Sequence, residues 1–66
     1  MLLLTQREAA LALRLSERTL ERWRVQGTGP RFVRLNHSIR YRPADVELWL
    51  ASRIVGSTSE EIDNGR

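Results

Sequence analysis

Near the start of the chain, apolar residues recur at helical spacing behind a helix start signal. Thr5 and Glu8 stand at the spacing of a capping box, in which each side chain accepts a hydrogen bond from the other residue's backbone N–H. Ala9, Ala10 and Leu13 follow at the spacing of one helix face. We therefore expect a helix that begins at Thr5, after a short apolar lead-in, and ends near Leu13.

A second stretch, Ser16 to Gln26, predicts a helix with an apolar side and a charged side. Ser16 is a suitable N-cap and Gly27 supplies the stop. Leu20 and Trp23 fall on the side that is expected to pack. The residues that fall roughly opposite are Arg18, Glu21, Arg22 and Val25. This opposite side is free to contact a partner.

Only Arg14 and Leu15 separate the two helices, so the second must turn sharply away from the first. This spacing is typical of a helix-turn-helix, in which the second helix is presented outward. An ordinary helical hairpin in a small core has the same spacing. The arginines of the second helix favour the helix-turn-helix.

After the breaker cluster Gly27–Pro30, the periodicity changes from helix to strand. Phe32–Leu35 and Ile39–Arg42 are short runs rich in β-forming residues, joined by the loop Asn36–Ser38, and they predict a β-hairpin. Alternation predicts an apolar face that is made by Val33, Leu35, Ile39 and Tyr41. It also predicts an arginine face that is made by Arg34, Arg40 and Arg42. Phe32 falls on the side of Arg34, and the pattern does not place it.

A third helix is expected from Pro43 to about Arg53, because the fixed φ of Pro43 suits the first helical position. Val46, Trp49 and Leu50 follow at helical spacing and should close the core over the hairpin. Both tryptophans of the chain lie among aliphatic residues at this spacing. We therefore assign them to the core, with stacking on nucleic-acid bases as the alternative.

The charge of the chain divides into a basic body and an acidic tail. The net charge is +3, and the acidic residues of the tail, 54–66, outnumber its arginine by two. Residues 1–53 form the one expected domain and carry a net charge of +5. This charge is compatible with binding a polyanion. The tail is too polar to offset its own ordering entropy, so we expect it to be mobile. All eleven basic residues are arginine, which suits phosphate and guanine but is equally expected from GC-rich coding.

The sequence offers little for catalysis, metals or cofactors. No Ser, His and acid set is evident, and Gly27–Pro30 precedes a strand without the lysine of a phosphate-binding loop. With no cysteine and one histidine, neither a disulfide framework nor a zinc site is expected. The apolar start is far shorter than a signal peptide's apolar segment or a membrane span. We expect a cytoplasmic protein that is not an enzyme, does not associate with a membrane and needs no cofactor.

Several short motifs, in a fixed order, carry a resemblance to a known group. They are Leu4–Thr5 with Ala9–Ala10, Ser16–Leu20 with Trp23–Arg24, Gly27 and Pro30, Arg40–Arg42, Asp45–Val46 and Trp49–Leu50. This order resembles the winged helix-turn-helix of the MerR-like superfamily, and more closely the excisionase and AlpA-like small DNA-binding proteins of phages and mobile elements. The resemblance implies a mostly α fold of helix, turn, helix, two-stranded wing and helix.

The chain departs from this group at two places. Members often have glycine where this chain has Arg14, a turn position that is compatible with positive φ. They also often have glycines at the wing tip, where this chain has Asn36 and His37. The turn and the wing tip are therefore the places where the group's geometry transfers least safely.

The resemblance implies that the second helix enters the DNA major groove and that the hairpin lies beside it as a wing. The expected groove contacts are Arg18, Thr19 and Arg22. The expected wing and backbone contacts are Arg34, His37, Arg40 and Arg42, with Thr5, Ser16 and Arg24 as further backbone contacts. Arg22 is the first choice for a guanine contact, and the alternative is a solvated residue paired with Glu21 or another acid.

The function implied is sequence-specific binding to double-stranded DNA as an excisionase, a recombination directionality factor. Several copies would bind adjacent sites, bend the DNA and bias a site-specific integrase toward excision of a phage or mobile element. Such a protein would be bacterial or phage-encoded and associated with the nucleoid. The alternatives are a transcriptional regulator of the same fold and, in another class, a protein-interaction adaptor that acts through the acidic run Ser59–Asp63.

Overall fold

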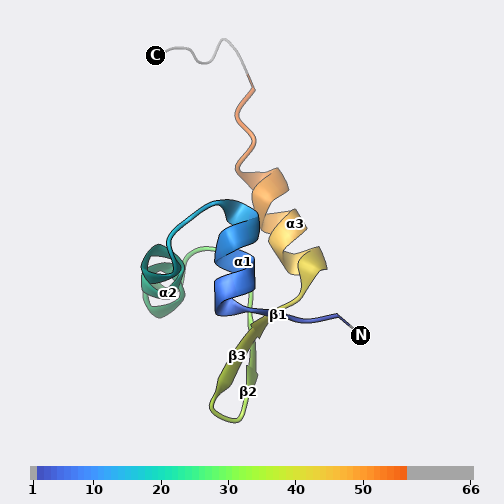
Figure 1. The fold of residues 1–66 in the computed structure, drawn as a ribbon. Helices are drawn as coiled ribbons and strands as arrows, with labels where there is room; N and C mark the ends of the chain where they lie inside the picture. The colour runs from blue at the N-terminus through green and yellow to red at the C-terminus, as the bar shows by residue number, and fades with distance from the viewer. Residues whose placement is uncertain (1, 57–66) are drawn as a thin grey trace.

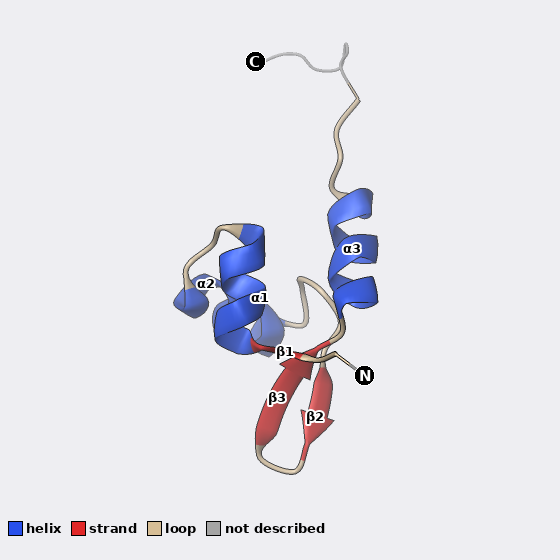
Figure 2. Cartoon of the chain, turned by 45° about the vertical axis from the view of Figure 1, so that its right-hand side comes forward, coloured by secondary structure: helices blue, strands red, loops and turns tan. Residues whose placement is uncertain are grey.

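In the computed structural model, residues 2–56 are described and form three helices and three short strands (Figure 1). In chain order they are β1 (Leu4–Thr5), α1 (Gln6–Leu13), α2 (Glu17–Gln26), β2 (Val33–Leu35), β3 (Ser38–Tyr41) and α3 (Pro43–Ser52). Helices α2 and α3 lie on opposite sides of α1, and the β2–β3 hairpin extends away from the helices (Figures 1 and 2). The expectation of a mobile tail concerns residues that, from 57 onward, lie outside the described part of the chain.

The starts of α1 and α2 are fixed by the side chains that the sequence predicted. The backbone N–H of Thr5 donates to Glu8 Oε1 at 2.9 Å, and that of Glu8 donates to Thr5 Oγ1 at 3.1 Å. At the next helix, the N–H of Thr19 donates to Ser16 Oγ at 3.1 Å. Each bond satisfies an N–H that a helix start otherwise leaves without an intrahelical partner, so the predicted start signals are confirmed.

The turn between α1 and α2 depends on a left-handed residue. Arg14 has φ 58° and ψ 40°, the conformation suggested by the glycine of the resembling proteins. The following N–H, of Leu15, donates to the carbonyl oxygen of Ala10 at 2.9 Å and closes the helix end. Because a Cβ meets the carbonyl oxygen in this region, Arg14 holds the turn at a cost of roughly 1 kcal/mol. The short turn lets α2 cross away from α1.

The sheet has a third strand that the sequence did not predict. Its order is β1-β3-β2, all antiparallel, with Leu4 opposite Tyr41 and Thr5 opposite Arg40. Strand β1 is only two residues long, too short to show any alternation. It forms because the chain enters α1 alongside the open edge of the hairpin. The winged helix-turn-helix fold is confirmed, with a sheet of three strands in place of two.

The faces of the hairpin differ from the prediction because its turn is shorter. Ser38 belongs to β3 and lies opposite Leu35, so only Asn36 and His37 form the turn. This register places Arg34 opposite Ile39, on the core side of the sheet, while Arg40 lies opposite Val33 on the other side. A shift of one residue moves every side chain of a strand to the other face. The predicted single arginine face is therefore wrong.

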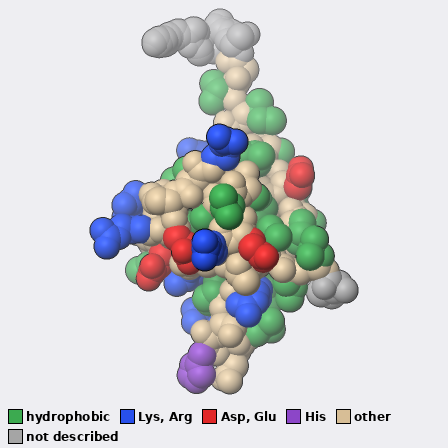
Figure 3. All heavy atoms as spheres, in the orientation of Figure 1, with side chains coloured by type: hydrophobic (Ala, Val, Ile, Leu, Met, Phe, Trp, Pro, Cys, Tyr) green, Lys and Arg blue, Asp and Glu red, His purple; other side chains and the backbone are tan. Residues whose placement is uncertain are grey.

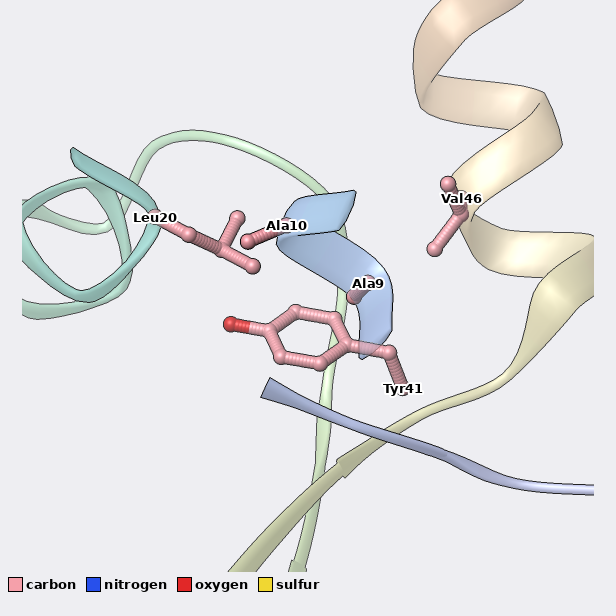
Figure 4. Close-up of a cluster of buried hydrophobic side chains, with 5 residues drawn as sticks. All are labelled: Ala9, Ala10, Leu20, Tyr41 and Val46. Carbon is pink, nitrogen blue, oxygen red and sulfur yellow. The ribbon is translucent and has the colours of Figure 1, made fainter. Parts of the chain in front are cut away.

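The core lies where α1, α2, β3 and α3 meet. Its buried apolar side chains are Ala9, Ala10, Leu20, Tyr41 and Val46 (Figure 4). The two alanines let α2 and the sheet approach α1 closely, and the ring of Tyr41 fills the space beside Ala9 and points its hydroxyl toward the side of Leu20 (Figure 4). Phe32, which the pattern did not place, packs against this core with its ring centroid 6.3 Å from that of Tyr41.

Helix α3 closes the other side of the core, but less completely than predicted. Val46 is buried, and Trp49 is half-buried with its ring centroid 5.4 Å from that of Trp23. Leu50, which was expected in the core, is 49% exposed. The core covers the side of α3 that carries Val46 and Trp49 and does not extend as far as Leu50. Within residues 2–56, no helix has the length and apolar character needed to span a membrane.

Candidate nucleic-acid interface

Helix α2 presents a solvent-exposed face while its opposite side is held in the core. Leu20 is only 1% exposed and anchors the helix against α1. On the other side of α2, all four side chains that the sequence assigned there are exposed: Arg18, Glu21, Arg22 and Val25. The predicted division of α2 into a packed side and a free side is therefore confirmed.

The arginines of this face have no partners among residues 2–56. The described part of the chain contains a salt bridge between Arg42 and Asp45, and none that involves Arg18 or Arg22. Neither guanidinium takes part in a side-chain hydrogen bond within that range. The alternative in which Arg22 pairs with Glu21 is thus not observed. No group within residues 2–56 therefore occupies the donors of either guanidinium, each of which has five N–H groups.

The two hydroxyls at the start of α2 bond to each other. Ser16 Oγ donates to Thr19 Oγ1 at 2.8 Å while it accepts from the N–H of Thr19. Thr19 is half-buried, in contrast to its arginine neighbours. The hydroxyl proton of Thr19 remains available, so this residue can donate one hydrogen bond to a base or a phosphate.

Phe32 joins α2 to the wing through two arginines. The guanidinium carbon of Arg24, from α2, lies 5.9 Å from the centroid of the Phe32 ring. That of Arg34, from β2, lies at the same distance, 5.9 Å. Arg24 also donates to Gln6 Oε1, which ties the end of α2 to the start of α1. Sequence reasoning missed Phe32 because it precedes β2, where strand alternation carries no information.

The wing arginines are separated by the register and by their partners. Arg40 is half-buried and donates to the backbone oxygen of Ile39 at 2.8 Å. Arg34 lies on the opposite face of the sheet, over Phe32. His37 is exposed at the tip of the hairpin, next to Asn36, which adopts φ 59° in the position where the resembling proteins have glycine.

Arg42 lies after β3 as the N-cap residue of α3, and not on the strand where the sequence placed it. Its Nε and Nη2 donate to the two carboxylate oxygens of Asp45 at 2.7 and 2.9 Å. These hydrogen bonds are the main reason that the pKa of Asp45 falls below its ordinary value of 3.8, and the same pair raises the pKa of Arg42. Asp45 is buried, so this arginine neutralises a charge at the edge of the core.

The face of the molecule in Figure 3 carries arginines on α2, with acidic side chains beside them, and on the hairpin, whose tip carries the histidine. Apolar side chains are prominent along α3 and the segment after it (Figure 3). The arginines of α2 and the histidine of the hairpin tip therefore lie on different elements from the apolar side chains of α3. Two protruding elements with arginines suit a long, ridged polyanion.

A family model described as a helix-turn-helix domain matches residues 3–54, a range that includes every described helix and strand. No curated protein matches the chain.

Proposed function

Because the chain belongs to the helix-turn-helix domain family, a family of DNA-binding domains and not of enzymes, we propose that it binds specific sequences of double-stranded DNA as an excisionase. Helix α2 enters the major groove, and the hairpin lies beside it as a wing. The groove contacts are Arg18, Thr19 and Arg22. The wing and backbone contacts are Arg34, His37, Arg40 and Arg42, with Thr5, Ser16 and Arg24 as further backbone contacts.

The observation that carries this proposal is that Arg18 and Arg22, on the exposed side of an anchored helix, have no partner among residues 2–56. A guanidinium that lies in the major groove donates two hydrogen bonds to guanine O6 and N7. Because neither arginine has to leave a partner among residues 2–56, such a contact breaks no interaction within that part of the protein.

The small contact area of one helix and one wing supports the excisionase role within this proposal. One helix and one wing read only a few base pairs, so a single copy binds with little selectivity. Several copies on adjacent sites would reach the selectivity that one lacks and would bend the DNA between them. The bent complex would then favour a site-specific integrase acting in the direction of excision.

Titration with DNA tests the binding part of the proposal. At moderate salt, the chain should bind a duplex that carries a mobile element's attachment site more tightly than a random duplex of equal length. Equal affinity for the two duplexes contradicts specific recognition. Chemical shifts recorded in the same titration should change along α2 and the hairpin.

Deletion of the gene tests the biological role. An excisionase is required for excision, so the deletion should reduce the number of excised circles while the transcript levels of neighbouring genes stay the same. The opposite result, altered transcripts with unchanged excision, would identify a transcriptional regulator that uses the same DNA contacts.

A further inference from the structure

The exposed side of α2 carries more than arginines. Arg18 is one helical turn from both Glu21 and Arg22, and two turns from Val25, so these four side chains form one continuous patch. We call them the mixed face of α2. The patch thus combines two cations with one carboxylate and one apolar side chain, all exposed to solvent.

Glu21 is a free carboxylate in the middle of this patch. Within residues 2–56 it forms no salt bridge, and the preceding acid on the same side of the helix, Glu17, is a like charge one turn away. Arg18 and Arg24 are opposite charges, each also one turn from Glu21, so the small charge effects of its neighbours on helix stability largely offset one another. A carboxylate also repels phosphates, so it weakens nonspecific binding to DNA.

A carboxylate in the major groove is favourable only where a base edge offers a hydrogen-bond donor. The exocyclic N4 amino group of cytosine is the donor that glutamate accepts from. Cytosine is paired with guanine, the base that the neighbouring arginines are suited to read. A DNA site that places guanine opposite the arginines and cytosine opposite Glu21 therefore offers a hydrogen-bond partner to each charged side chain of the mixed face.

Val25 is the apolar member of the patch and is 77% exposed. A β-branched residue is a weaker helix former than the long polar residues usual on an exposed helix surface. Its side chain belongs neither to the core nor to the partly buried apolar residues that pack against the core. The C5 methyl group of thymine is the apolar partner that the major groove provides.

We infer that Glu21 and Val25 are specificity-determining residues, Glu21 for a cytosine and Val25 for a thymine, beside the guanine read by the arginines of the mixed face. This inference rests on the proposed binding of α2 in the major groove. It adds cytosine and thymine to the bases that the DNA site should contain, and it assigns their recognition to two exposed residues that lie outside the core.

Selection of binding sites from a random duplex pool tests the role of Glu21, with the full chain and the variant Glu21→Gln. Glutamine bonds to adenine N6 and N7, so the preferred base should change from cytosine to adenine at one position and stay the same elsewhere. At that position the discrimination should be about fivefold or more. Glu47→Gln is the matched control, because it removes an exposed acid from α3 and should leave every preferred base unchanged.

The outcomes separate the inference from the proposed function. If the unchanged chain selects no sequence, specific DNA binding itself is wrong. If it selects a sequence that Glu21→Gln also selects, DNA binding stands and the role of Glu21 is wrong. An equal gain in affinity for every duplex would show that Glu21 only repels phosphate, which also overturns the inference.

Replacing thymine by deoxyuridine, one position at a time in the selected site, tests Val25. Loss of a single methyl group should weaken binding of the unchanged chain about three- to fourfold at one position. Val25→Ala should bind both forms of that site equally. If no position responds to deoxyuridine, or if Val25→Ala responds as the unchanged chain does, Val25 does not read thymine. Circular dichroism melting curves should show that both variants keep the fold.

Discussion

Helix α2 and the β2–β3 hairpin both carry arginines outward, but they hold them in different ways. The arginines of the mixed face of α2 have no partners among residues 2–56. In and directly after the hairpin, each arginine already makes a contact: Arg34 with the Phe32 ring, Arg40 with the Ile39 carbonyl oxygen and Arg42 with Asp45.

This difference suggests a division of work between the two regions. A free guanidinium on a rigid helix forms two hydrogen bonds to one base edge and thereby distinguishes sequences. A guanidinium held by a ring, a carbonyl or a carboxylate is less free to align with one base edge, and it is better suited to a phosphate, which accepts from many directions and carries no sequence information. We therefore expect α2 to read DNA and the wing to hold it.

The largest effect is expected from removal of the α2 anchor. Leu20→Ala deletes a fully buried side chain and should lower the free energy of unfolding by about 2–5 kcal/mol. For a domain of this size, that is a large part of the total. Thermal melting followed by circular dichroism measures the loss. Leu35→Ala, at a wing position that is 47% exposed, is the control and should change little. Equal losses would mean that the wing is held as firmly as α2.

The next effect compares one arginine from each region. Arg22→Ala should remove about 1–3 kcal/mol of discrimination at one base pair, because it removes a bidentate contact. Arg40→Ala should weaken binding to all duplexes alike and lower the salt slope of the affinity by about 1. Affinities for a selected and a random duplex over a range of salt concentrations measure both. Indistinguishable behaviour of the two variants would contradict the division between reading and holding.

The ion pair at the base of the wing should make stability depend on pH. The pKa of Asp45 in the folded state lies below its ordinary value of 3.8, so the pair contributes fully above that value and its contribution is lost as the pH falls through the folded pKa. Denaturant midpoints below about pH 4 should therefore fall for the unchanged chain, with a smaller fall for Asp45→Asn. Glu47→Gln controls for the change in net charge. Identical acid profiles for the chain and Asp45→Asn would show that Arg42 is not committed to this pair.

The smallest effect concerns the turn in front of α2. Arg14→Gly should raise the free energy of unfolding by up to about 1 kcal/mol, because glycine adopts the left-handed conformation without a Cβ clash. Arg14→Ala keeps the Cβ and should give no such gain. Neither variant touches the mixed face, so the preferred DNA sequence should not change. A changed preference would mean that the turn sets the angle of α2.

Predictions from the sequence succeeded where the interacting groups are close along the chain. The caps at Thr5 and Ser16 bond to residues three positions away, and the two sides of α2 follow from its own helical period. The hairpin faces failed because they depend on pairing between strands, and pairing changes with a single residue of turn length. The prediction that Leu50 lies in the core was wrong for a similar reason. The packing of distant segments decides how much of α3 the core covers.

The sequence by itself determined the order of the three helices and the hairpin, the helix start signals and the side of α2 that remains exposed. Only the tertiary structure decided that Leu4 and Thr5 form a third strand, that Arg34 and Arg40 lie on opposite faces of the sheet, and that Phe32 links the wing to α2. The reason is physical: hydrogen bonds within a helical turn need only neighbouring residues, whereas strand register and contacts between elements exist only after distant segments have packed together.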